Sequence, residues 1–414
     1  MSSEPFFFTW SAQREASGIE IVSGQGARFT TKDGAEWLDL SALSYQANLG
    51  HGHRGVIDAL KSQCDRLLLT TPSGLYPQKS QLAEKLLAIA PKGFSKVFFT
   101  LGGAEAVENA IKIARLYTGR HKLLSRYRSY HGATLGALTL SGDHRRPPLE
   151  PGLVGVTHVL DCYESRVPGG AMVIEGGGSA EAVEATLRLE GSRSVAAVFL
   201  EPVPGANGVL IPPAGYWDGV RAACDDHGAL MVADCVLTGF GRLGTPLGFE
   251  DFGDGVPDLI TISKGLTGGY APLGAVLVSD AIAQHFEDAV LWAGLTFYGH
   301  PLGVAAALAA IEAYERDQLF ARAKTLGVQL ASRLAALQDA MPERIARLRS
   351  KGLLAALELD VDFTQLAEIK GRIDAARLSV HWNDRYRTLI LSPPLVISER
   401  ELDDGVTRLH RALE

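Results

Sequence analysis

Two ionisable residues stand at the ends of apolar runs in the middle of the chain, and their chemistry is complementary. Asp234 follows the run 230–233, and Lys264 follows the run 259–263. A carboxylate buried there needs a partner, such as a protonated pyridine nitrogen. A buried lysine is a nucleophilic amine because burial lowers its pKa. The pair fits pyridoxal phosphate, although singly Asp234 can cap the following loop and Lys264 can extend to solvent.

A glycine-rich turn earlier in the chain offers a phosphate site. Residues 96–100 read as a strand, and Gly102 and Gly103 lead into a helix with apolar residues at helical spacing over 104–117. Backbone N–H groups at a helix N-terminus bind phosphate, and glycines let a ligand approach closely. Alone, the turn can equally be a tight connection that binds nothing. Its place before Asp234 and Lys264 on successive strand ends favours a cofactor site.

Two other motifs compete with this interpretation. Residues 239–244 (GFGRLG) fit the GxGxxG dinucleotide fingerprint, which would make the protein a nicotinamide oxidoreductase. The preceding strand ends near Asp234 and residues 245–258 read as loop, so we interpret the match as accidental. His51 and His53 resemble metal ligands, but no third ligand is near; we expect structural roles for both and predict no metal site.

The elements that must position these residues alternate between strands and helices from residue 80 to residue 263. The strands are continuous apolar runs, as expected for a mainly parallel sheet covered on both faces. The expected strands are 96–100, 122–125, 195–200, 229–234 and 259–263, and the expected helices are 55–69, 80–90, 104–117, 132–140 and 214–227.

The two ends of the chain have a different sequence pattern from the middle. Residues 19–40 read as two strands joined by a turn at 32–34. After Pro301, long Ala/Leu-rich helices and two strands indicate a smaller α+β lobe. We predict an N-terminal segment (1–60) that contributes to the small domain, a large cofactor-binding domain (61–302) and a C-terminal small domain (303–414).

Composition narrows the class of protein. The chain has 414 residues, 46% of them hydrophobic, which suffices for a large core. Its net charge of −7 argues against a nucleic-acid partner. Four widely spaced cysteines without a CxxC pair indicate reduced thiols in a cytoplasmic protein. The first residues lack the pattern of a signal peptide or a membrane span.

Several short motifs in sequence order resemble those of one enzyme family. They are Gly102-Gly103-Ala104-Glu105-Ala106, Tyr130-His131-Gly132, Glu201-Pro202-Val203, Asp234 through Gly244, Ser263-Lys264-Gly265, Leu295 through Pro301 and Ser392-Pro393-Pro394. With them, the chain resembles the class III pyridoxal-phosphate aminotransferases, the ω-transaminase group of fold type I, over essentially its whole length. The resemblance implies an α/β fold with a mainly parallel seven-stranded sheet and a smaller α+β domain.

The resemblance also implies roles at the cofactor. Lys264 would bond to pyridoxal 5'-phosphate and then move a proton, while Asp234 would keep the pyridine nitrogen protonated. Tyr130 and Val236 would lie on opposite faces of the ring, and Glu201 near its hydroxyl side. The remaining cofactor-binding positions are Gly102, Gly103, Ala104 and His131.

Further implied positions concern the partner subunit and the substrate. Thr296 is similar to a threonine that reaches the phosphate in the neighbouring subunit, which implies a homodimer, possibly a tetramer, with shared sites. Tyr45 matches an aromatic residue of the substrate pocket, and Trp10 is a candidate for the same pocket. Arg385 is a candidate for binding a substrate carboxylate.

Three positions depart from the family pattern. Ala104 stands where serine is usual, and Cys235 where most members carry glutamate. Asn383 occupies the place of an arginine that meets substrate carboxylates in amine–pyruvate transaminases; an amide cannot make that charged bidentate contact. Arg385 therefore substitutes from a shifted register, or carboxylates are bound in another way.

The expected reaction is a ping-pong aminotransfer. An amine or ω-amino acid donor gives its amino group to the cofactor, and a 2-oxo acid, pyruvate or 2-oxoglutarate, takes it. A racemase, mutase or decarboxylase on the same fold is the main alternative, since the protein chooses which bond of the substrate breaks.

Overall fold

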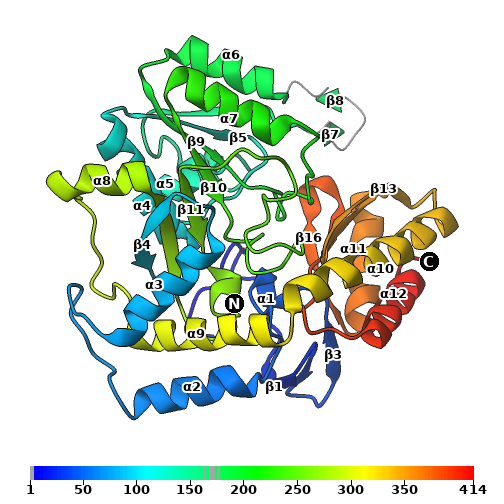
Figure 1. The fold of residues 1–414 in the computed structure, drawn as a ribbon. Coiled ribbons are helices and arrows are strands. Elements are labelled where there is room, and N and C mark those ends of the chain that lie inside the picture. Colours follow the sequence, from blue (N-terminus) through cyan, green and yellow to red (C-terminus); the bar gives the residue numbers. More distant parts are fainter. Residues whose placement is uncertain (1–3, 163–164, 167–172, 175–177) are drawn as a thin grey trace.

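The computed structural model describes residues 4–162, 165–166, 173–174 and 178–414. A seven-stranded sheet lies at its centre (Figure 1). In spatial order its strands are β4 (Phe94–Thr100), β12 (Gly274–Ser279), β11 (Leu259–Ile262), β10 (Leu230–Asp234), β9 (Val195–Leu200), β5 (Lys122–Arg126) and β6 (Val156–Val159). The strands from β11 to β6 pair in parallel, whereas β12 is antiparallel to both of its neighbours. The predicted mainly parallel sheet is confirmed.

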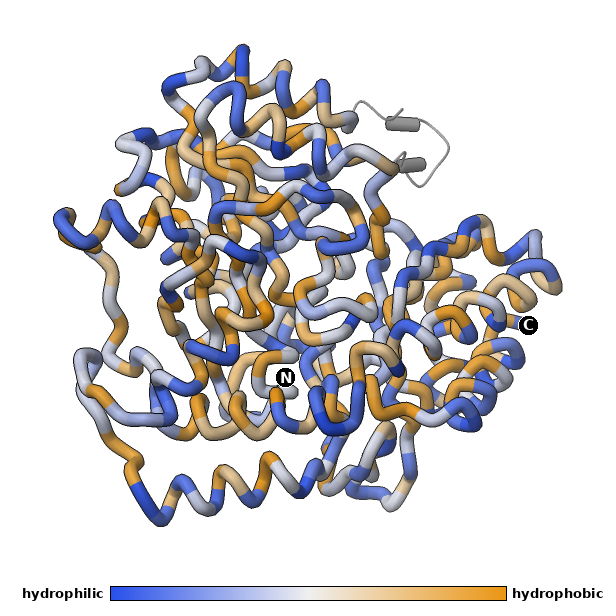
Figure 2. Tube along the Cα trace, viewed as in Figure 1, coloured by the Kyte–Doolittle hydropathy of each residue, from blue (hydrophilic) through white to orange (hydrophobic). Residues whose placement is uncertain are grey.

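Helices cover both faces of this sheet because alternate strand residues point to opposite sides. Leu259 packs in one apolar cluster with Ile111 of α4 (Gly103–Thr118), and Ile260 packs in another with Val220 of α7 (Tyr216–His227). Figure 2 shows hydrophobic residues concentrated along the central strands. The other helices of this part are α2 (Arg54–Cys64), α3 (Pro77–Ile89), α5 (Leu135–Leu140), α6 (Ala180–Glu190), α8 (Asp280–Asp288) and α9 (Pro301–Arg316).

Two further four-stranded sheets are built from the ends of the chain. One contains β1 (Ile21–Gln25), β2 (Arg28–Thr31), β3 (Glu36–Asp39) and β15 (Leu378–Ser379). The other contains β13 (Ile345–Lys351), β14 (Leu354–Leu359), β17 (Thr388–Leu391) and β16 (His381–Asn383), beside α10 (Leu319–Ala340), α11 (Phe363–Ala375) and α12 (Glu399–Leu413). Because β15 pairs in parallel with β3, the N-terminal strands join the C-terminal part of the chain. The domain boundaries at residues 60 and 302 stay a prediction.

Some predicted elements differ from the observed ones. Residues 19–31 were expected as one strand, but Gly26 adopts a φ of +58° and separates β1 from β2. The first long helix ends at Cys64 rather than at residue 69. Strands β12 and β13 and helices α6 and α8 were not predicted. Among the described residues, no helix combines the length and the apolar character needed to cross a membrane.

Candidate active site

The carboxyl ends of the central strands converge on one cavity of about 230 Å³. Open α/β sheets bind ligands at this edge. Residues from the ends of β9, β10 and β11 and from the start of α4 contribute to its wall. The lining residues are Gly103, Ala104, Tyr130, His131, Gly132, Ala133, Glu201, Ala206, Asp234, Val236, Leu237, Ser263 and Lys264.

Asp234 is the last residue of β10 and is buried. His131 Nδ1 lies 2.7 Å from its Oδ2, and its Oδ1 accepts hydrogen bonds from Thr261 Oγ1 (3.1 Å) and from the backbone N–H of Val236 (3.1 Å). These three contacts fix the carboxylate, because a rotation of the side chain would break all of them. A carboxylate fixed at the cavity wall can hold a cation that enters the cavity.

Lys264 begins the short 3-10 helix η2 (Lys264–Leu266), and Ser263 alone separates it from β11. Its φ of +40° is unusual for a residue with a side chain. Burial lowers the pKa of its amine, partly opposed by the negative charges of Asp234 and Glu201. A lysine with a lowered pKa carries more of the neutral amine, the form that attacks a carbonyl carbon.

The glycine-rich turn lies at the N-terminus of α4, as predicted. A Cβ on Gly103 would lie only 2.7 Å from Val236 Cγ1, so no larger residue fits there without a shift. A Cβ on Gly132 would likewise lie 2.6 Å from the methyl carbon of Ala104. Because Gly103, Ala104 and Gly132 are small, the loops that follow β4, β5 and β10 can meet at the N-terminus of α4. Free backbone N–H groups at a helix N-terminus favour an anion.

Glu201 follows β9, is buried and lines the cavity. Its Oε1 accepts the backbone N–H of Tyr130 (2.9 Å), which ties two walls of the cavity together. Burial raises the pKa of Glu201 to about 7, and the nearby Asp234 adds to the effect, against the opposing influence of His131. The glutamate can therefore gain or lose a proton near neutral pH.

The ring of Tyr45 lies beside the amine of Lys264. Lys264 Nζ is 5.3 Å from the centre of its ring, and His381 of β16 stacks on Tyr45 with ring centres 4.0 Å apart. Burial lowers the pKa of His381 to about 4, so this imidazole is neutral at pH 7. A neutral ring can pack against Tyr45 without repelling the amine of Lys264.

The other predicted positions lie outside the cavity wall. Trp10 is 55% exposed and its ring lies near Arg145; Thr296 is exposed. Arg385 is exposed on η3 (Asp384–Tyr386). Asn383 is buried, and its Nδ2 donates to the carbonyl oxygen of Ala206 (3.0 Å) in the cavity wall.

The residues at first sight suited to other sites have structural partners. His51 Nε2 lies 2.9 Å from Asp39, and His53 Nδ1 accepts the N–H of Val56 at the start of α2. Cys235 is buried, and burial holds the pKa of its thiol well above the usual value. It is therefore a neutral core thiol beside Asp234.

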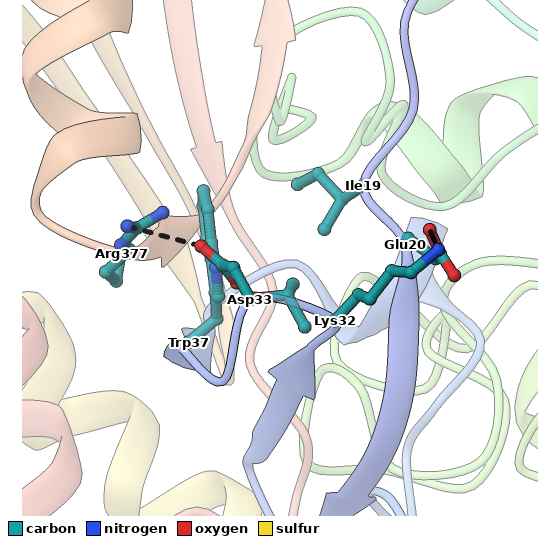
Figure 3. A pocket seen from close by; sticks show the side chains of 7 residues that line it. Ile19, Glu20, Lys32, Asp33, Trp37 and Arg377 are labelled. Atoms are coloured by element: carbon teal, nitrogen blue, oxygen red, sulfur yellow. Dashed lines mark hydrogen bonds and ion pairs between the residues drawn. The ribbon is translucent and has the colours of Figure 1, made fainter.

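A second hollow lies on the N-terminal sheet, away from the chemistry (Figure 3). Its charged residues pair with one another: Lys32 Nζ lies 3.0 Å from Glu20, and Arg377 lies 3.7 Å from Asp33.

Comparison with known proteins identifies the family. The model of the family "Aminotransferase class-III" matches residues 10–413. The chain belongs to the class III aminotransferases. It is 33% identical to an omega-aminotransferase of Caulobacter vibrioides, with 95% of this chain and 93% of the relative covered. It is also 33% identical to a diaminobutyrate–2-oxoglutarate transaminase of Halomonas elongata, over 97% and 91%.

Solved structures of aminotransferases share the fold. A taurine:2-oxoglutarate aminotransferase from Bifidobacterium kashiwanohense, in complex with PLP and glutamate, superposes with a TM-score of 0.89 at 35% identity and covers 98% of this chain and 94% of its own. The family match and this structural similarity show that the present protein is a pyridoxal-phosphate-dependent aminotransferase. The fold-type I architecture predicted from the motifs is confirmed.

The cavity residues fit that cofactor. A carboxylate, an amine and a helix N-terminus face one space, which suits a pyridine nitrogen, an aldehyde and a phosphate respectively. Sequence reasoning missed the lining residues Ala133 and Ala206, because small apolar side chains carry no chemical signal, and it assigned no role to Leu237 and Ser263, which lie within the quoted motifs.

Proposed function

We propose that this class III aminotransferase accepts an amine or ω-amino acid as donor and pyruvate or 2-oxoglutarate as acceptor. The observation that carries the proposal is the joint placement of Asp234, Lys264 and the start of α4 around one cavity. The donors for which two of the similar enzymes are named are consistent with it, since taurine and diaminobutyrate both carry an amine at a terminal carbon.

The residues of the cavity have separate roles in this proposal. When bound, pyridoxal phosphate supplies an electron-withdrawing ring that stabilises negative charge on the adjacent substrate carbon. Asp234 would hold the ring nitrogen protonated through its carboxylate. Lys264 would bind the aldehyde carbon and then carry a proton to and from the substrate as general acid and base.

Other residues would orient the cofactor. Tyr130 and Val236 would lie against the two ring faces, and the N–H groups of Gly103 and Ala104 would donate to the phosphate. Ala104 lacks the hydroxyl of serine, so backbone groups would carry this contact. Glu201 would lie near the ring hydroxyl.

We also propose a homodimer in which Thr296 contributes to the neighbouring site. Apolar side chains are exposed on two segments, 65–76 and 289–299, with Leu75 94% and Trp292 74% exposed. The segments are adjacent, because Tyr76 Oη donates to the carbonyl oxygen of Gly299 (2.5 Å). Such a patch marks an interface. All four cysteines are free thiols, which supports the proposal of a cytoplasmic enzyme.

A half-reaction tests the function. The holoenzyme is mixed with a donor amine in the absence of any 2-oxo acid, and the cofactor absorbance is followed. Stoichiometric conversion of the bound aldehyde to the amine form of the cofactor, reversed by pyruvate or 2-oxoglutarate, is the expected result. A racemase or decarboxylase would turn over its substrate while the aldehyde form persists.

A further inference from the structure

Arg145 lies between two aromatic rings at the edge of the active site. It follows α5 in the chain, and its guanidinium carbon is 4.0 Å from the ring centre of Tyr130, which lines the cavity. The same carbon is 5.5 Å from the ring centre of Trp10, in the N-terminal segment. Cation–π contacts of this kind hold a guanidinium in place while leaving its N–H groups to other acceptors.

One edge of the guanidinium is already occupied. Nε of Arg145 lies 3.1 Å from Asp143 Oδ2, and Nη2 lies 2.5 Å from the same oxygen. The side chain of Asp143 is buried, so the anchor is firm. Among the described residues, no acceptor contacts Nη1 of Arg145. The edge formed by Nη1 and Nη2 is the one that a planar oxyanion can bind.

The charge of Arg145 acts on the reacting groups. Burial is the main cause of the lowered pKa of Lys264, and the positive charge of Arg145 lowers this pKa further. It also opposes the rise that burial causes in the pKa of Tyr45 and of Tyr130. Arg145 thus contributes positive potential to the space in which a substrate must meet Lys264.

Two further buried arginines, Arg128 and Arg349, contact the loop 206–208, which begins in the cavity wall. There, three successive carbonyl oxygens are each held by a different side chain: that of Ala206 by Asn383 (3.0 Å), that of Asn207 by Arg128 (3.0 Å) and that of Gly208 by Arg349 (2.7 Å). Arg128 and Arg349 therefore hold the loop 206–208 in place, and Asn383 contacts the same loop through an uncharged amide. Arg385 is exposed.

We propose that Arg145, framed by Trp10 and Tyr130, binds an anionic group at the far end of the donor, so that the enzyme prefers amines bearing a carboxylate or a sulfonate over neutral amines. This specificity role rests on the proposed function. Arg145 is fixed by Asp143 in advance, so little side-chain freedom is lost on binding. A role that is only structural, as a support for Tyr130, would affect all donors alike.

Matched donors test the proposal. Half-reaction rates of the holoenzyme are measured against the concentration of β-alanine, taurine and β-alaninamide, the last being the neutral isostere of the first. Arg145→Gln is expected to raise the half-saturating concentration of β-alanine and taurine by about 10- to 100-fold, the range for one lost charged hydrogen bond. The value for β-alaninamide should stay within about twofold.

A neighbouring arginine provides the control. Arg146 pairs with Glu150 (2.9 Å) and lies 3.3 Å from His158, so Arg146→Gln should leave all three donors unchanged. Trp10→Ala should weaken the two anionic donors in the same direction as Arg145→Gln, and Trp10→Phe should not. A response to β-alanine without one to taurine would restrict the site to carboxylates.

Two outcomes separate the inference from the function on which it rests. If Arg145→Gln weakens β-alaninamide as much as β-alanine, or changes neither, the anion site is wrong while aminotransfer stands. If the wild-type holoenzyme converts no amine of either kind, with the cofactor bound, the proposed donor class itself fails.

Discussion

Lys264 is the residue on which both the covalent and the proton-transfer roles depend. Lys264→Ala should leave the cofactor bound by Asp234 and the start of α4, but lower turnover by more than 10⁴-fold, since a nucleophile and a general base are lost together. Absorbance of the purified variant measures the bound cofactor, and product formation measures turnover. Aminotransfer that continued at more than a hundredth of the wild-type rate would contradict the role of Lys264.

Glu201 makes stability depend on pH. Burial raises its folded-state pKa to about 7, above an ordinary value of 4.5, so the folded protein holds a proton that the unfolded chain releases. Stability should therefore fall as pH rises from 4.5 to 7, by on the order of 3 kcal/mol. Glu201→Gln keeps an acceptor for the N–H of Tyr130 and should remove most of this fall.

Thermal unfolding of the apoprotein between pH 5 and pH 8 measures that difference. Glu368→Gln, at an exposed position of α11, is the control. An unfolding temperature with the same pH dependence in the wild type and in Glu201→Gln would show that Glu201 does not titrate in this window.

At the scale of elements, the segment α1 (Ala42–Tyr45) is strained. All four residues have positive φ, between +43° and +69°, which is the left-handed conformation that disfavours side chains. Asp39 accepts hydrogen bonds from the N–H and the hydroxyl of Ser41, and Ser41 O accepts from His381 and Ser392. This network holds Tyr45 over Lys264, at a cost in backbone energy typical of functional sites.

A glycine substitution tests the strain. Ser44 is exposed with φ +69°, so Ser44→Gly should relieve about 1 kcal/mol of strain, offset in part by the greater freedom of glycine in the unfolded chain. Ser62→Gly, at an exposed position in the regular helix α2, should instead destabilise the protein by about 0.5–1 kcal/mol. Equal losses of unfolding temperature in both variants would argue against stored strain.

The strands of the parallel part were predictable because they are buried on both faces and read as continuous apolar runs, as in 195–200 and 259–262. Strand β12 is also a continuous apolar run, but it was not predicted. The eleven residues 263–273 are too few for a parallel crossover, which indicates its antiparallel direction once the strand is recognised.

Asp234 and Lys264 stand out at strand ends, whereas Arg145 and His381 reach the site through tertiary contacts that no local pattern encodes.

At the scale of the whole molecule, the apolar surface on 65–76 and 289–299 supports the proposed homodimer. Leu69 is 82% and Phe297 54% exposed, which is costly in water for side chains of this size. Thr296 lies beside Phe297 and outside the cavity wall of its own chain. A second copy that covers the patch would carry its threonine toward a site on the other chain.

Mixed dimers test this shared site. A Thr296→Ala chain paired with a Lys264→Ala chain keeps one complete site, made of Lys264 from the first chain and Thr296 from the second. In the second dimer, a chain with both changes is paired with a wild-type chain. The only Lys264 of this dimer belongs to the wild-type chain, and the other chain contributes an alanine at position 296 to that site. The second dimer should bind the cofactor about 10-fold more weakly at its active site, the loss expected for one hydrogen bond to a phosphate.

Differently tagged chains allow both mixed dimers to be purified, and activity against cofactor concentration gives the affinity of the active site. Thr325→Ala, at an exposed threonine of α10, replaces Thr296→Ala in the control pair. If Thr296 served its own chain, the order would reverse and the first dimer would be the weaker one. The direction of the difference therefore assigns Thr296 to one chain or the other, independently of how large the effect is.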